Sequence, residues 1–87
     1  MTENYPLLPD DIRDALDDYA AHGHEHGGFV MACLRNEFVE AVCRADSGNL
    51  AVILDIARYI YNELPGPCWG SPAKVEAWRK LKVVAHA

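Results

Sequence analysis

Hydrophobic positions recur at intervals of three and four residues through most of the chain, a pattern that predicts helices. We expect the first helix over about residues 9–22, because Pro9 suits the first helical position and Gly23 can end the helix in a left-handed conformation. Its apolar stripe is formed by Ile12, Ala15, Leu16, Tyr19 and Ala20. The opposite face carries Asp10, Asp14, Asp17 and Asp18, which is typical of a solvated surface.

Two further helices follow from the same spacing. The second covers about residues 28–45, with apolar positions at Phe29, Val30, Cys33, Leu34, Phe38, Ala41 and Val42. Polar residues then interrupt the pattern, and either Asp46 or Ser47 can cap a third helix over about residues 47–64. This third segment is apolar on nearly every side, which places it at the centre of a bundle or in an interface between subunits.

The last helix has the clearest beginning, since Ser71 is a good N-cap and Pro72 then occupies the first helical position. We expect it over about residues 71–82, with a stripe formed by Val75, Trp78 and Leu81. No alternating pattern argues for a strand. The predicted fold is therefore all-α, a compact bundle of about four helices in a single domain spanning residues 1–87.

Size and composition narrow the class of protein. A chain of 87 residues builds only a marginal core, so we expect a homo-oligomer. Hydrophobic residues make up 51% and charged residues 24%, which is typical of globular domains. No apolar run is long enough to cross a membrane and no signal peptide is visible, so we expect a cytoplasmic protein. Three cysteines without a paired motif fit a reducing compartment.

The formal charge of −5 is unevenly distributed along the chain. Residues 1–26 hold seven acids and one base, whereas residues 65–87 hold one acid and four bases. An acidic chain is poorly suited to nonspecific binding of nucleic acid, which depends on many phosphate contacts. A local basic cluster can nevertheless hold a small anion, so an anionic partner should be small.

A histidine-rich turn, H-G-H-E-H-G-G, follows the first helix. Imidazole and carboxylate groups are ligands for zinc, copper or nickel, which makes His22, His24 and His26 candidate metal ligands. The spacing of two residues in a glycine-rich turn matches neither a structural zinc motif nor a catalytic helix motif. A polar turn between helices is the favoured interpretation, and we expect no bound metal and no other cofactor.

Catalytic motifs are not evident in the sequence. There is no glycine-rich phosphate loop, nucleophile elbow or paired-cysteine metal motif. Cys68 precedes a helix N-terminus, which can lower the pKa of a thiol, but it lies three residues before the Ser71 cap and lacks an evident base. We therefore expect a binding protein and no enzyme.

The octet P-G-P-C-W-G-S-P at residues 65–72 separates the third and fourth helices. Pro65 and Pro67 end one helix, and Ser71 with Pro72 begins the next, so the loop is stiff at both ends. Two interpretations of Trp69 remain open. It stacks on a planar ligand whose anionic group sits at the helix N-terminus near Lys74, or it folds back on the bundle against Tyr61 or Trp78.

Residues 19–79 resemble a family of short, mostly uncharacterised proteins of tailed phages and prophages. The similarity is carried by H-G-x-x-x-G-x-F, L-R-N, A-x-x-R-A-D, I-x-x-Y-x-Y-N-E-x-P and C-W-G-S-P-x-x-V-x-x-W, of which Y-N-E-x-P-x-x-C-W-G-S-P is the most specific. The resemblance implies a viral origin more than a defined activity. Relatives carry no histidines at the positions of His24 and His26, which weakens the metal interpretation.

For a phage protein of this size the resemblance implies three roles. The first is counter-defence by sequestering a small anionic or nucleotide-type immune signal. The second is inhibition of a host protein by the acidic first helix, acting as a nucleic-acid mimic, and the third is a structural accessory role. The sequestration hypothesis, which we favour, assigns ligand contacts to Arg58, Tyr61, Asn62, Cys68, Trp69, Gly70, Ser71 and Lys74.

Overall fold

The computed structural model describes residues 4–86 of the chain, and side chains from 4 to 83. All regular structure in this range is helical, as the sequence predicts. The elements are α1 (Asp10–His22), α2 (Gly28–Leu34), α3 (Phe38–Arg44), α4 (Ser47–Ala51), α5 (Ile53–Glu63), the 3-10 turn η2 (Gly66–Cys68) and α6 (Pro72–His86). The two long middle helices of the prediction are thus each divided in two.

The first division lies at Asn36, which adopts a left-handed conformation with φ 61°. The N–H of Asn36 donates to the Cys33 carbonyl, and the N–H of Glu37 donates to the Ala32 carbonyl. This pair of bonds is a Schellman motif, in which asparagine replaces the usual glycine and satisfies the last carbonyls of α2. The expected helix over 28–45 was wrong at this point, because the apolar spacing continues across a break in the backbone.

The second division is smaller. Val52, with φ −114° and ψ 11°, leaves the helical conformation between α4 and α5. The Asp46 carboxylate caps α4 by accepting from the N–H of Asn49 at 2.7 Å, which decides between the two predicted caps. α6 extends to His86 and so passes the predicted end near Lys82.

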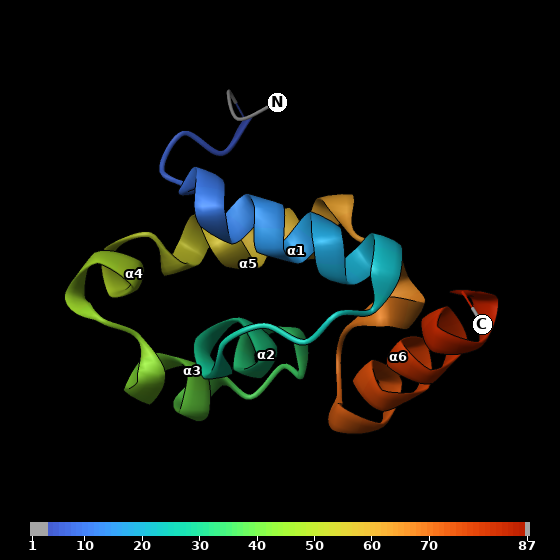
Figure 1. Ribbon diagram of the computed structural model, residues 1–87. Helices are drawn as coiled ribbons and strands as arrows, with labels where there is room; N and C mark the ends of the chain where they lie inside the picture. The colour runs from blue at the N-terminus through green and yellow to red at the C-terminus, as the bar shows by residue number, and fades with distance from the viewer. Residues whose placement is uncertain (1–3, 87) are drawn as a thin grey trace.

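Helix α1 is the central element, because it packs against α2, α5 and α6. Figure 1 shows α1 beside α5, with α2 and α3 on one side of them and α6 at the opposite end from α4. The predicted stripe of α1 is confirmed, since Ile12, Leu16 and Tyr19 are buried. The core also contains Met31 and Leu34 of α2, and Ile56, Cys68 and Val75 from the second half of the chain.

The central position predicted for residues 47–64 was wrong in part. α5 buries Ile56 and Ile60 against the core but leaves Leu54 and Tyr61 exposed. The first four described residues are tied to this helix, because the Asp55 carboxylate accepts from the N–H of Leu7 at 2.8 Å and Tyr5 donates to Glu63. Among the residues that the structure describes, no helix is long and apolar enough to span a membrane.

Candidate functional site

The loop at residues 65–72 is fixed to the rest of the fold at several points. α5 ends at Glu63, η2 forms the next turn, and Trp69 is extended. The N–H of Gly70 donates to the Leu34 carbonyl at 2.8 Å, which ties the loop to α2. Ser71 Oγ accepts from the N–H of Lys74 at 3.1 Å, so Ser71 caps α6 as the sequence predicts.

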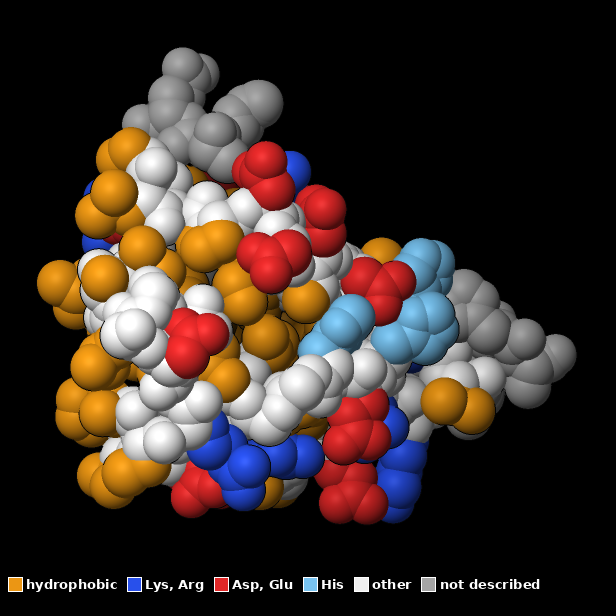
Figure 2. Space-filling model, turned by 60° about the vertical axis from the view of Figure 1, so that its left-hand side comes forward, with side chains coloured by type: hydrophobic (Ala, Val, Ile, Leu, Met, Phe, Trp, Pro, Cys, Tyr) orange, Lys and Arg blue, Asp and Glu red, His pale blue; other side chains and the backbone are white. Residues whose placement is uncertain are grey.

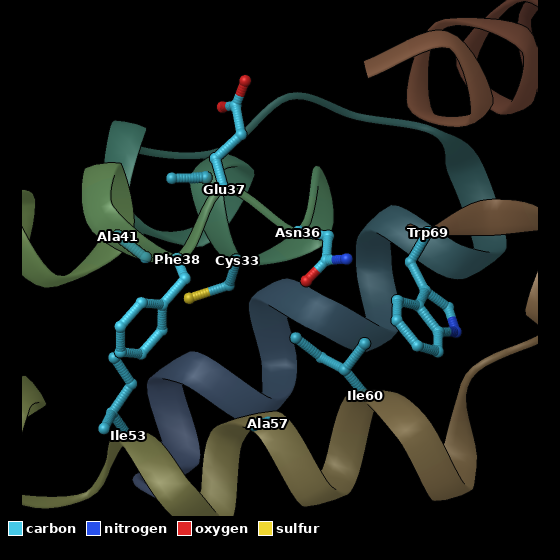
Figure 3. A pocket seen from close by; sticks show the side chains of 10 residues that line it. Cys33, Asn36, Glu37, Phe38, Ala41, Ile53, Ala57, Ile60 and Trp69 are labelled. Atoms are coloured by element: carbon cyan, nitrogen blue, oxygen red, sulfur yellow. The ribbon is translucent and has the colours of Figure 1, made fainter. Parts of the chain in front are cut away.

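Trp69 folds back on the helices. Its ring packs on the core and meets Tyr61 edge to face, with 6.1 Å between ring centroids. One side of the ring forms the end wall of an apolar cavity of about 120 Å³, lined also by Cys33, Phe38, Ile53, Ala57 and Ile60. Figure 3 shows Trp69 at one end of this cavity and Phe38 with Ile53 at the other. The cavity is well below the ~300–1,000 Å³ typical of sites for whole small molecules.

The N-terminus of α6 offers little to an anion. Pro72 has no N–H, the Lys74 N–H is bound to Ser71, and the Gly70 N–H is bound to Leu34. Lys74 itself is exposed beside Gly70, whose φ of 122° favours glycine. The Lys74 N–H at this helix end is therefore occupied by the Ser71 cap, and Pro72 contributes no donor to a phosphate.

Three other predicted ligand contacts, Cys68, Arg58 and Asn62, are engaged within the fold. Cys68 is buried, and burial raises the pKa of its thiol to about 11, which is opposite to the shift that an activated nucleophile needs. Arg58 pairs with Asp55 at 3.5 Å and lies 5.7 Å from the centroid of the Tyr5 ring. The amide of Asn62 is beside the same Tyr5 hydroxyl. The eight predicted ligand contacts are thus not gathered into one site.

The histidine turn is organised around one carboxylate. His24 Nδ1 and His26 Nε2 each lie 3.0 Å from the same Asp18 oxygen, and the rings of His22 and His24 stack at 5.3 Å. Figure 2 shows the histidine side chains together beside acidic groups. Partial desolvation raises the pKa of Asp18, but the hydrogen bonds and charges of His24 and His26 outweigh it, so the pKa is lowered. Among the described residues no group of three histidine, cysteine or acidic side chains is placed to hold a metal ion.

Several aspartates of α1 make contacts within the molecule. Asp17 accepts a hydrogen bond from the Tyr59 hydroxyl at 2.6 Å, and Arg13 lies within 3.6 Å of both Asp10 and Asp14. With Asp18 held by the histidine turn, the charge of this face is partly compensated. Its predicted role as a nucleic-acid mimic remains a prediction, and the contacts do not favour it.

Basic side chains gather at a groove between the end of α2 and one face of α6. The groove has a volume of about 760 Å³ and is lined by Arg35, Pro72, Val75, Glu76, Arg79, Lys80 and Val83. Three cations therefore face one carboxylate, on a chain whose net charge is −5. Such a groove attracts small anions, because low-dielectric walls focus the field of the lining charges.

The cations of the groove differ in how they are held. Arg79 donates through Nε to the Gly23 carbonyl at 3.3 Å, and its Nη2 lies 3.5 Å from Glu25. Lys80 pairs with Glu76 at 3.4 Å along the helix. Arg35 is half-buried and, within the part of the chain that the structure describes, has no acidic partner. Arg35 is thus the cation of the groove with its donors available to a ligand.

Comparison with known proteins adds no family. No family model, no curated protein and no solved structure matches the chain.

Sequence reasoning did not find this groove, although it located the basic C-terminal region. Arg35 follows α2 while Arg79 and Lys80 belong to α6, so no local pattern joins them. The sequence does contain a signal for the end of α2, the tripeptide L-R-N. Asparagine can adopt the left-handed conformation that ends a helix, and Asn36 does so directly after Arg35.

Proposed function

We propose that this protein is a small binding protein that sequesters a phosphorylated, nucleotide-type anion in the groove between α2 and α6. The observation that carries the proposal is the half-buried Arg35 without an acidic partner, which lines one groove with Arg79 and Lys80. Desolvating a charge is costly unless it is paired, so a partly buried arginine of this kind is suited to a ligand of opposite charge.

The chemistry of the lining favours phosphate groups. A guanidinium presents parallel N–H donors that match phosphate oxygens in a bidentate geometry, and a lysine adds a mobile point charge. The volume of the groove lies in the range typical of small-molecule sites. Pro72 and Val83, both exposed, supply an apolar wall against which the uncharged part of the ligand can pack. Among the described residues no aromatic ring lines the groove, so the proposal rests on recognition of phosphate and not on stacking of a base.

The biological role that we propose is supported by the resemblance to short proteins of tailed phages and goes beyond the viral origin that the resemblance implies. A phage protein that binds a nucleotide-type signal of the host's immune system lowers the free concentration of that signal and so acts in counter-defence. In this proposal the protein has no catalytic role, since withdrawal of the signal needs only affinity and abundance.

Thermal melting with a ligand panel tests the proposal. The panel contains inorganic phosphate, pyrophosphate, linear and cyclic nucleotides and ADP-ribose. A ligand at a hundred times its dissociation constant stabilises the folded state by about 2.7 kcal/mol, which raises the melting temperature of a domain of this size by roughly 10–20 °C. We expect at least one phosphorylated member to do so, and Arg35→Gln to abolish the shift.

Two matched variants locate the site. Arg13→Gln removes the same charge from α1, outside the groove, and should keep the ligand-induced shift. Lys74→Gln removes a charge at the Trp69 loop, and it should also keep the shift if the groove is the site. A flat response of the unmodified protein across the panel contradicts the proposal, as does a shift that survives Arg35→Gln and disappears in Lys74→Gln.

A further inference from the structure

A second surface of the molecule is apolar and exposed. Five large side chains on α3, α4 and α5 are between 46% and 76% exposed: Phe38, Val39, Leu50, Leu54 and Tyr61. In Figure 2 the side of the molecule that carries α4 comes forward, and hydrophobic side chains gather along its left-hand edge. We refer to these five residues as the apolar face. The anion groove shares no lining residue with it.

Two of the five residues, Phe38 and Tyr61, are linked through the small cavity in front of Trp69. Phe38 of α3 and Ile53 of α5 line the same cavity, and Leu54 follows Ile53 directly. Tyr61 continues the face through its edge contact with Trp69, which forms the far wall of the cavity. Figure 3 shows the Phe38 ring beside Ile53 at the open end, while the Glu37 carboxylate points away.

The area of the apolar face fits an interface. At roughly 150–250 Å² for each large aromatic and less for each aliphatic side chain, the five residues expose on the order of 600 Å². A monomer's largest apolar patch is about 300–600 Å², and a stable complex buries about 800 Å² per partner. The apolar face with its immediate rim therefore approaches the area that one subunit of a stable dimer buries.

The same face carries both a protruding group and a hollow that accepts it. Phe38 is 72% exposed and stands at the edge of a cavity of about 120 Å³ with an almost entirely apolar lining. A dry apolar cavity of ~150 Å³ is able to hold a benzene ring, so this smaller cavity accepts the greater part of one. In a two-fold symmetric pair each patch meets its own copy, so a ring offered by one subunit meets a hollow offered by the other.

We infer that the apolar face binds a second copy of this chain, with Phe38 of each subunit inserted into the cavity between Trp69 and Ile53 of the other. This dimer is independent of the proposed anion binding. α6 lies at the opposite end of the molecule from α4 (Figure 1), and none of the five residues lines the groove, so the dimer does not use the groove residues. The dimer also covers exposed hydrophobic area that a small core leaves on this chain.

Sedimentation equilibrium of the full chain between about 1 and 100 µM tests the inference. We expect twice the monomer mass at the upper concentrations. Phe38→Ala should raise the dissociation constant at least tenfold, because it removes an aromatic anchor from a pocket. Leu54→Glu should give a monomer throughout, with an unchanged helical circular dichroism spectrum, since Leu54 is exposed and its replacement leaves the core intact.

The matched control is Leu81→Glu, which changes a similarly exposed leucine on α6 and should leave the dimer unaffected. A monomer at the highest concentration overturns the inference and leaves the apolar face to a different protein. An oligomer that Leu81→Glu disrupts as strongly as Leu54→Glu overturns it as well, because the contact would then lie elsewhere. A dimer that forms without any anion binding would support this inference and contradict only the proposed function of the groove.

Discussion

The hydroxyl of Tyr19 donates a hydrogen bond to the carbonyl oxygen of Cys68 at 2.8 Å, and both residues are fully buried. This bond joins the central helix α1 to the turn that precedes α6. The Val75 carbonyl lies 3.4 Å from the same hydroxyl, at the wall of the anion groove. Burial of the ring is the main cause that raises the pKa of Tyr19 to about 12, and the charge of a nearby Cys68 thiolate would raise it further in the same direction. The hydroxyl therefore keeps its proton at physiological pH.

Removing this donor should destabilise the protein. Within the described residues, the Cys68 carbonyl accepts one hydrogen bond, from the Tyr19 hydroxyl. Tyr19→Phe leaves this buried carbonyl without a partner and should lower the free energy of unfolding by about 1–3 kcal/mol. Urea unfolding followed by circular dichroism measures the change. Tyr61→Phe is the control, because Tyr61 is 73% exposed and should tolerate the change with little effect. Equal stability of the two variants would contradict the account of this bond.

Gly23 should be intolerant of a side chain. Its φ of 71° is left-handed, and a Cβ would lie 2.9 Å from Lys82 Cβ and 3.2 Å from Arg79 Cα. Gly23→Ala therefore combines backbone strain with a clash against α6, and should cost more than about 1 kcal/mol. Because α6 must shift to relieve the clash, anion binding should weaken in the same variant.

Gly27→Ala provides the comparison for this prediction. Gly27 has φ −60°, and no atom lies within 4 Å of a Cβ built at this position. Gly27 is the N-cap of α2, where glycine is preferred to alanine, so the free energy of unfolding should fall by about 0.5–1 kcal/mol, less than in Gly23→Ala. If Gly23→Ala and Gly27→Ala have the same melting temperature, the close approach of α6 to the end of α1 is incorrect.

The carboxylate of Asp18 should contribute to the stability of the histidine turn in a pH-dependent way. Its folded-state pKa is lowered, so its contribution is present above the unfolded value of about 4 and is lost as the pH falls through the folded value. The difference in stability between the unmodified protein and Asp18→Asn should therefore shrink as the pH is lowered from about 5 to 3.

Removing the two histidine partners checks the cause of this pH dependence. In a double variant with His24→Gln and His26→Gln, the further change Asp18→Asn should have little additional effect, because the groups that lower the pKa are gone. A stability difference that is unchanged between pH 5 and 3 would show that the shared carboxylate does not act in this way.

The three thiols should differ in reactivity. Cys43 is exposed, whereas burial raises the pKa of both Cys33 and Cys68 to about 11. At neutral pH, a disulfide reagent should therefore label Cys43 first, the half-buried Cys33 more slowly because its thiol is rarely ionised, and the buried Cys68 only on the time scale of opening. Cys43→Ser should remove the fast phase, and unfolding in urea should release all remaining thiols at once. A fast phase that persists in Cys43→Ser would mean that Cys33 or Cys68 is accessible.

Much of the fold could be predicted from local chemistry in the sequence. Gly23, Asp46 and Ser71 each mark a helix boundary by a backbone or capping requirement that acts within a few residues, and all three are confirmed. The end of α2 was missed because Asn36 takes the conformation usually given to glycine. The apolar spacing ran on to Phe38, which belongs to a new helix and is exposed.

The sites were harder to predict, because they depend on contacts between residues far apart in the chain. The loop of residues 65–72 has the predicted boundaries, but only the fold shows that Trp69 faces the helices and that the Gly70 N–H is bound to Leu34. Likewise, Arg35 meets the α6 cations only because the fold brings the end of α2 beside the start of α6, where the Gly70 N–H donates to the Leu34 carbonyl. Such long-range proximity has no signature in local spacing.

The most direct test of the central claim is an NMR titration of the ¹⁵N-labelled protein with pyrophosphate. The proposed function predicts saturable shifts gathered at the amides of Arg35, Val75, Arg79 and Lys80, and their loss in Arg35→Gln. Shifts gathered instead between Cys68 and Lys74, or none up to millimolar pyrophosphate, would contradict anion binding in the groove between α2 and α6.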